Sequence, residues 1–333
     1  MPCTTKVVHG ITIFSIMKKS SLLSRLLSVT TTLFGISIFV FLVLRVIPGD
    51  TITSSLGIET GALNQEQIES LRKYYGIDQP IIGQYFSWIS SFIQGDLGFS
   101  YSTGAPVLQL TKSALLVTME LALLGTTLGV FLGISVGMFS ARKPGSLRDF
   151  LGQFFGLLAL AIPGFVLSTT IVTVMANKFQ YFPNGNEYMS PVEDLWMNLQ
   201  QMLFPSLVLG IAVAAPVMRT TRSALLETVD KDFVRTAIGK GVTAKAVRLK
   251  HILRNSLIPI VTMTGIQFGY LLGGAVIVEK IFALPGMGRQ ILDAINKREY
   301  ATVQSSIMVF AILFVTINLI TDLIYRRIDP RIK

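Results

Sequence analysis

The sequence predicts an all-α integral membrane protein with six transmembrane helices. Of its 333 residues, 51% are hydrophobic and only 14% are charged, whereas about 25% of the residues in a soluble domain are charged. Six apolar runs contain no Asp, Glu, Lys or Arg, and each is long enough for the helix of about 20 residues that crosses a bilayer. These runs exceed the length of a barrel strand, and lipid-exposed backbone must form its hydrogen bonds internally, so helices are expected.

The spans are separated by loops of very different lengths. They are predicted at 26–44, 121–141, 150–177, 195–218, 255–278 and 300–321. Residues 1–25 form a lead-in, and 26–333 are expected to form one integral domain. A long loop at 47–112 joins spans one and two, and a basic loop at 219–254 joins spans four and five.

The positive charge is unevenly placed along the chain. Twenty of the 29 Lys and Arg lie in the lead-in, at 142–149, at 219–254 and after span six, and eight lie in the opposite loops. Cytoplasmic loops carry such an excess of Lys and Arg. Both termini and the 219–254 loop are therefore expected on the cytoplasmic side of a multi-pass membrane protein, and the net charge of +10 does not require a nucleic-acid partner.

The first span is predicted to stay as an anchor rather than to be cleaved as a secretory signal. Lys18, Lys19 and Arg25 precede it, as in a signal peptide, but the run is long for a signal and ends in "RVIPGD" without a small-x-small site. Met17, followed by "KKSS", is an equally natural start, so no structure is predicted for 1–16.

Two helical patterns occupy the external loop at 47–112. "LNQEQIESLRKYYGID" has Asn64 as N-cap and ends at Gly76, and "QPIIGQYFSWISSFIQGDLG" begins with Pro80 and ends at Gly95. Two interpretations are equally supported. The helices lie on the outer membrane face with their aromatic residues at headgroup level, or they form a short soluble cap packed on itself.

A third pattern follows span five. "FALPGMGRQILDAINKREY" breaks at Pro285 and Gly286 and resumes as a short amphipathic helix from Arg289. Such breaks are tolerated at membrane depth where the backbone lines a cavity. The segment is therefore expected to turn back toward the pore mouth.

The basic loop predicts a helix-turn-helix. From Asp232, apolar or small residues recur at helical spacing, at Phe233, Val234, Ala237, Ile238 and Gly241. After a turn the helix resumes near Thr243 and runs into span five, with Pro259 in an early turn where its missing N–H costs little. The small residues on one side allow a groove of another protein to approach closely. A hairpin whose cations only contact anionic lipid is an equally good interpretation of this pattern.

Several motifs together resemble one family. "RTAIGKGV" followed by "HILRNSLIPI" is similar to the E-A-A-x-x-x-G loop of ABC importer permeases, in the version found in oligopeptide, dipeptide and nickel permeases. "FLVLRVIPGD", "GGAVIVEKIFALPGMGRQILDAI" and "DLIYRRIDPRIK" extend the resemblance from about residue 20 to the end. Arg235, Thr236 and Ala237 occupy the E-A-A places, with Arg in place of Glu, and Gly241 is the glycine.

The resemblance implies a permease subunit of a bacterial inner membrane, whose coupling helix inserts into a cytosolic ATP-hydrolysing subunit. It also implies a second homologous permease, two ATP-binding subunits, and an external substrate-binding protein, for which we expect docking on 64–95 and 285–298. The cargo would be peptides or nickel complexes, and no cofactor is implied. The residues expected to couple the loop to the ATPase are Asp232, Arg235, Thr236, Ala237, Gly241 and Lys245.

Other classes lack the residues they need. "GKGVT" lacks the spacing of the phosphate-binding G-x-x-x-x-G-K-[ST] loop, so the chain is not expected to hydrolyse ATP. An ion-coupled carrier or channel acting alone, the main alternative, usually needs ionisable groups inside the membrane, and the six spans have none. The only cysteine is Cys3, and the only histidines, His9 and His251, are far apart in the chain, so neither a metal site nor a catalytic set is expected. Candidate pore-lining residues are Gln267, Gln304 and Ser305.

Overall fold

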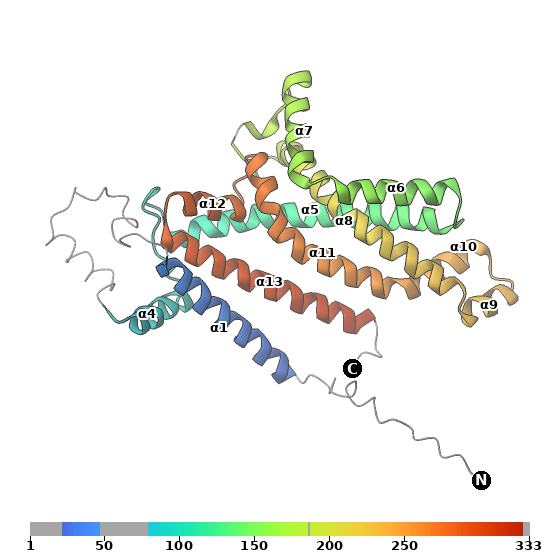
Figure 1. Cartoon of the computed structure of the whole chain (residues 1–333), viewed down its shortest axis with the longest axis horizontal. Helices are drawn as coiled ribbons and strands as arrows, with labels where there is room; N and C mark the ends of the chain where they lie inside the picture. Colours follow the sequence, from blue (N-terminus) through green and yellow to red (C-terminus); the bar gives the residue numbers. More distant parts are fainter. Residues whose placement is uncertain (1–21, 47–78, 186, 329–333) are drawn as a thin grey trace, which may run out of the picture.

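The computed structural model describes residues 22–46, 79–185 and 187–328, and within them it is an elongated bundle of helices (Figure 1). Five of these helices are long and apolar enough to cross a membrane, or six when one bent pair counts as a single span. The described part contains no β-strand beyond one isolated bridge between Phe99 and Pro106. The predicted fold class is confirmed.

The helices follow the predicted order. They are α1 (Leu22–Val46), α4 (Ile81–Ile93), α5 (Val107–Ala141), α6 (Leu147–Ala161), α7 (Gly164–Phe179), α8 (Leu195–Val229), α9 (Asp232–Gly239), α10 (Ala244–Ala246), α11 (Arg254–Ile281), α12 (Met287–Asn296) and α13 (Tyr300–Ile328). A 3-10 turn, η1 (Pro183–Gly185), precedes α8, and a π-helical segment, η2 (Val247–Leu253), lies between α10 and α11. The predicted helix at 64–76 and the lead-in through residue 16 lie outside the described residues.

The core is built on the pair α5 and α8, which lie side by side in the bundle (Figure 1). α5 presents a glycine every fourth residue to α8: Gly125, Gly129, Gly133 and Gly137. A Cβ atom on Gly129 would lie 2.6 Å from the Cβ of Val213 and 2.7 Å from the carbonyl oxygen of Gly210. Small residues allow helix backbones to approach this closely in membranes, and van der Waals contact then holds the helices together.

The third predicted span, 150–177, is not one straight helix. It forms α6 and α7, whose axes differ by 91°. Pro163 lacks a backbone N–H, and the residue before a proline avoids helical dihedrals; Ile162 is accordingly extended, with φ −86° and ψ 115°. α6 packs back against α5 and α8, whereas α7 leaves the bundle at a steep angle (Figure 1).

The other membrane helices are also longer than the predicted spans, and the difference is largest for three of them. α5 begins at Val107, before the predicted end of the external loop, and α8 runs through Pro216 to Val229, inside the predicted basic loop. α10, η2 and α11 form one continuous helix from Ala244 to Ile281. Pro259 therefore lies in a helix interior and not in an early turn, because the helix starts before the apolar run does.

An ion pair joins the start of α6 to α8 at the same end of the bundle as α9. Arg222 donates from Nε and Nη2 to the two carboxylate oxygens of Asp149, at 2.6 and 2.7 Å. Only 2% of the Asp149 side chain is exposed, against 22% for Arg222. Paired, hydrogen-bonded charges of this kind are the form in which a carboxylate is tolerated inside a protein.

At the other end, the second predicted outer helix is present as α4 and packs on α1. The hydroxyl groups of Tyr85 and Ser37 are 2.7 Å apart, and the rings of Phe41 and Tyr85 meet edge to face. The third predicted outer helix is α12, which begins at Met287 rather than at Arg289. Both helices lie at the left-hand end of Figure 1, opposite α9.

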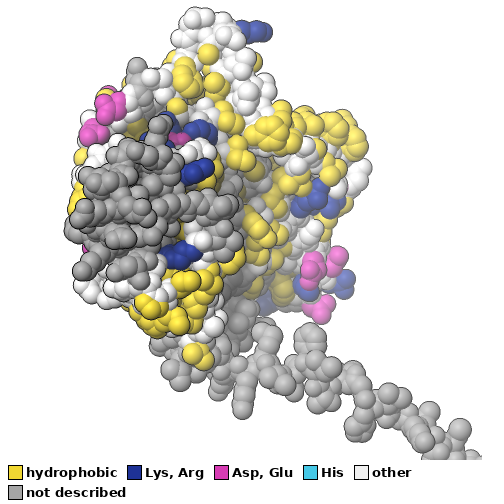
Figure 2. Space-filling model, turned by 60° about the vertical axis from the view of Figure 1, so that its left-hand side comes forward, with side chains coloured by type: hydrophobic (Ala, Val, Ile, Leu, Met, Phe, Trp, Pro, Cys, Tyr) yellow, Lys and Arg dark blue, Asp and Glu magenta, His cyan; other side chains and the backbone are white. Residues whose placement is uncertain are grey.

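Large apolar side chains cover much of the outside of the bundle. Phe131 on α5, Phe155 on α6 and Tyr270 on α11 are 69%, 59% and 73% exposed. Figure 2 shows broad hydrophobic surface on the visible face, with charged side chains gathered in separate patches. An apolar surface of this extent is expected where lipid or another membrane subunit covers it.

Candidate functional site

The helix-turn-helix predicted for the basic loop is present. α9 begins at Asp232, and Val234 and Ala237 on its inner face are buried against Val247 and Ile252 of η2. Leu225 of α8 and Val242 of the turn pack against the same cluster. This small hydrophobic cluster fastens α9 to the helix that becomes α11.

The turn after α9 depends on Gly241. This residue has φ +74°, a left-handed conformation that side chains other than glycine adopt at a cost. The N–H of Gly241 donates to the carbonyl of Ile238, and the N–H of Val242 donates to that of Ala237, at 2.9 and 3.2 Å. These two bonds form a Schellman motif with glycine in its usual place. The loop glycine noted in the sequence therefore terminates α9 and sets the direction of the next helix.

The structure divides the predicted coupling residues between two faces. Ala237 is only 6% exposed, so it stabilises the loop from inside instead of meeting a partner. Asp232, Arg235, Thr236, Gly241 and Lys245 are exposed. Two apolar side chains not in the predicted set, Phe233 and Ile238, are 41% and 60% exposed. They were missed because helical spacing alone places them on the same broad apolar stripe as Val234 and Ala237.

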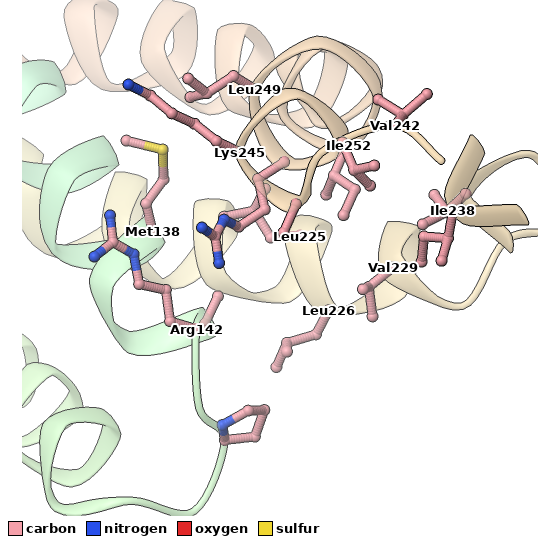
Figure 3. Close-up of a pocket in the computed structure, with 16 residues that line it drawn as sticks. Met138, Arg142, Leu225, Leu226, Val229, Ile238, Val242, Lys245, Leu249 and Ile252 are labelled. Carbon is pink, nitrogen blue, oxygen red and sulfur yellow. The ribbon is translucent and has the colours of Figure 1, made fainter. Parts of the chain in front are cut away.

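A cavity of about 700 Å³ lies beside α9, between the ends of α5 and α8 and the α10–η2 segment (Figure 3). Arg142 and Lys245 line one side of it, Ile238 and Val242 the other, and Leu225 lines the wall between them. α9 is thus held firmly on η2, while open space separates it from the end of α5.

The three candidate pore residues occupy different environments. Gln267 is partly buried on α11, and its amide nitrogen lies 3.6 Å from the sulfur of Met263. Gln304 and Ser305 of α13 are 7% and 1% exposed, and the Ser305 hydroxyl donates to the carbonyl of Leu97 at 3.2 Å. Gln304 and Ser305 are therefore buried by the packing of this chain against itself.

Two buried carboxylates beside α12 were not predicted as site residues. Glu279 directly follows the predicted span five at 255–278, but α11 extends past it and its side chain is fully buried. Glu299, 5% exposed, accepts hydrogen bonds from the Ser100 hydroxyl at 3.0 Å and the Thr302 hydroxyl at 2.8 Å. Burial would raise the pKa of Glu299, but hydrogen bonds from Ser102, Thr302 and Ser100 outweigh it and hold the pKa below its ordinary value. Glu299 thus ties the 97–104 turn to the start of α13.

These features define a class: a multi-pass membrane protein with a compact helix-turn-helix at one end and short helices at the opposite end. The chain belongs to the family described as "Binding-protein-dependent transport system inner membrane component", which matches residues 129–333, and the family's N-terminal counterpart matches 18–122. It is a transmembrane permease of an ATP-driven ABC importer, of the dipeptide, oligopeptide and nickel group, and not an ion-coupled carrier.

Characterised relatives agree with this assignment. The protein named "Glutathione transport system permease protein GsiC" from Escherichia coli and its namesake from Shigella dysenteriae are each 36% identical over 311 residues, covering 93% of this chain and 98% of the relative. The structure titled for inward-facing conformations of the MetNI methionine ABC transporter matches at a TM-score of 0.54 and 16% identity, over 66% of this chain and 97% of that chain. At this level of identity, the similarity shows that the two chains share a fold.

Replacing Gly241 by valine is expected to lower transport by roughly tenfold without blocking insertion into the membrane. No atom lies within 4 Å of a Cβ at this position, so the cost comes from backbone strain, about 1–2 kcal/mol. The measurement is the rate of substrate uptake at equal membrane abundance.

Gly239, two residues earlier, provides the matched control. It also has open space around a Cβ atom, but its φ is not positive. Gly239→Ala should therefore transport normally. Equal uptake by Gly241→Val and the wild type would show that this turn geometry is not needed.

Proposed function

We propose that this chain and a second, homologous permease together form the translocation pore, and that each permease docks its α9 loop on one of two cytosolic ATP-binding subunits. The observation that carries this is the two-sided character of α9. Its inner face is buried in the chain's own cluster, while Phe233 and Ile238 are exposed at the two edges of that face, Ile238 beside the cavity, and Arg235 and Lys240 are exposed next to them. Apolar anchors with a polar rim are what helix-in-groove recognition requires.

We place α9 and both termini on the cytoplasmic side. The excess of Lys and Arg in 142–149 and 219–254 supports this orientation. The end of α13 and the α9–α10 region both lie in the right-hand half of Figure 1, which agrees with it. The outer face then carries α4 and α12, which we propose as the docking surface of the substrate-binding protein.

The energetic requirement on the loop is modest. ATP binding needs only to favour one pore conformation over the other by a few kcal/mol, because a ligand shifts a two-state equilibrium by its difference in affinity for the two states. The buried cluster between α9 and η2 supports this role, since movement of α9 would be passed to α11.

We propose a small peptide as the cargo, and glutathione is the first compound to test. The support is the name of the relatives that share 36% identity along almost the whole chain. Nickel complexes, the other cargo expected from the resemblance, serve as the comparison in the test.

Reconstitution tests the assembly. The tagged chain, expressed with its genomic neighbours, should co-purify with an ATPase and a second permease, and proteoliposomes should take up labelled glutathione only with ATP inside and binding protein outside. Solute uptake by this chain alone, with no ATPase, would contradict the proposal. Uptake of nickel in place of glutathione would change the cargo only.

Thiol labelling tests the orientation. In a Cys3→Ser background, Lys245→Cys should react with a membrane-impermeant maleimide in inside-out vesicles and stay protected in right-side-out vesicles. Ile295→Cys on α12 should show the opposite pattern, and a reversed result at either position would refute the orientation.

A further inference from the structure

We propose that Glu279 is a positioning residue that fastens the outer helix α12 to α11, so that movement begun at the coupling loop reaches the outer face. This inference rests on the proposed docking of α9 on an ATPase. It assigns a role to a buried carboxylate that has no cation within salt-bridge distance in the described part of the chain.

Three helices meet at this carboxylate. The Thr118 hydroxyl of α5 donates to Oε1 of Glu279 at 2.6 Å, and the backbone N–H of Arg289 donates to Oε2 at 3.0 Å. The N–H of Met287 in turn donates to the Thr118 oxygen at 2.9 Å. Glu279 and Thr118 therefore accept backbone N–H groups from the first turn of α12, which have no partner inside that helix.

The first turn of α12 fits directly onto α11. A Cβ atom on Gly286 would lie 2.2 to 2.5 Å from the carboxylate atoms of Glu279, and one on Gly288 would lie 2.6 Å from the Cα of Val276. Met287, between these glycines, is fully buried. Gly288 thus allows close contact between the two helix backbones, and Gly286 leaves room for the Glu279 carboxylate.

The same helix contacts the coupling loop at its other end. Ala244–Ile281 is one helix of 38 residues, and Val247 and Ile252 near its start hold α9 through the buried cluster. Figure 1 shows the path from α9 and α10 along α11 toward α12. A displacement of α9 is therefore carried by α11 to the Glu279 junction.

Other contacts between α11 and α12 are weaker candidates for this role. Lys280 and Asp293 form a salt bridge of 2.6 Å, but their side chains are 49% and 37% exposed. Exposed pairs are screened by water and contribute little. Hydrogen bonds to a buried carboxylate contribute more, because no water is there to replace a lost partner. The Glu279 junction should therefore dominate the attachment of α12.

The test uses the complete complex with its ATPase subunits, in a Cys3→Ser background with Ile295→Cys as a reporter on α12, where Ile295 is 51% exposed. In the otherwise wild-type complex, the rate of maleimide labelling at position 295 should differ at least threefold between the nucleotide-free and the vanadate-trapped states. Glu279→Gln keeps the shape of the side chain, but it replaces one oxygen acceptor by an NH2 group that cannot accept a hydrogen bond from Thr118 or from the Arg289 N–H. It should abolish that difference and lower glutathione uptake at least tenfold, with basal ATPase activity within twofold of wild type.

Asp293→Asn is the matched control, because it removes the exposed salt bridge of the same two helices. It should keep both the labelling difference and the uptake. If Glu279→Gln does not assemble, Thr118→Val is the second variant. It removes one acceptor and one donor of the junction without placing an amide there, and it should give the same loss of coupling.

A rescue separates attachment from a general effect on folding. A short bis-maleimide joining Lys280→Cys to Asp293→Cys, with the native residue at position 295, should restore uptake in assembled Glu279→Gln, because it reattaches α12 after folding. Retention of the labelling difference in Glu279→Gln and Thr118→Val, or no restoration by the cross-link, would overturn the role of Glu279 and leave the proposed function standing. If the wild-type complex purifies without an ATPase, or if its labelling does not depend on nucleotide at all, both the role of Glu279 and the proposed function would be overturned.

Discussion

Replacing Gly129 by leucine is expected to prevent the chain from accumulating as a folded protein. The added Cβ would lie 2.6 Å from the Cβ of Val213 and 2.7 Å from the carbonyl oxygen of Gly210, whereas carbon atoms pack at about 3.5–4.0 Å. Overpacking costs about 1–3 kcal/mol where side chains can yield, and occasionally more. Here a helix backbone would have to move, so the loss should be a large part of the 5–15 kcal/mol that typically stabilises a native protein.

The measurement is the monodisperse fraction in detergent of a fluorescent fusion. Gly35→Leu on α1 is the control, because no atom lies within 4 Å of a Cβ there, and it should behave as wild type. Val213→Ala should not rescue Gly129→Leu, because the Cβ of residue 213 and the carbonyl of Gly210 both remain. A folded Gly129→Leu protein would show that α5 and α8 do not pack this closely.

The double substitution Phe233→Asp and Ile238→Asp is expected to weaken binding of the ATPase at least a hundredfold without affecting the fold. Both side chains are exposed in the isolated chain, at 41% and 60%, so the chain itself loses little. Fully burying one large apolar side chain contributes about 1.5–3 kcal/mol, and each 1.4 kcal/mol is a factor of ten in affinity. Docking can bury only the exposed parts of the two side chains, which together equal about one fully buried side chain, so the lost contacts account for about ten- to hundredfold. The two charges placed in an apolar groove raise the effect to at least the predicted factor.

Co-purification of the ATPase at a series of salt concentrations measures this effect. Ile295→Asp on α12 is the matched control, since it adds a charge at a similarly exposed apolar position on the other end of the molecule. It should retain the ATPase. Full retention of the ATPase by the double variant would show that this face of α9 does not dock.

Much of the local structure could be predicted from the sequence, because it depends on neighbours along the chain. Runs of apolar residues predicted the membrane helices, and the spacing from Asp232 together with Gly241 predicted α9 and the turn after it. The break at Pro163 had a local signal as well, the proline itself, which was overlooked inside a long apolar run.

The glycines show what sequence alone does not decide. "GISVG" and "LLGGAV" look alike as small-residue runs, yet Gly133 and Gly137 lie against α8, whereas Gly273 and Gly274 have no atom of this chain near a Cβ position. The difference depends on which helix faces each glycine, and that is set by the packing of the whole bundle.

The sequence by itself determined the membrane class, the helical content and the geometry of the turn after α9, since hydropathy, helical periodicity and the left-handed preference of glycine act within a few residues. Only the tertiary structure decided which face of α9 is free and that Glu279 meets Thr118 and the N-terminus of α12. Thr118 and Glu279 are 161 positions apart, and no local preference brings them together. Their contact exists because α5, α11 and α12 pack at one point, where a buried carboxylate is stable only when donors surround it.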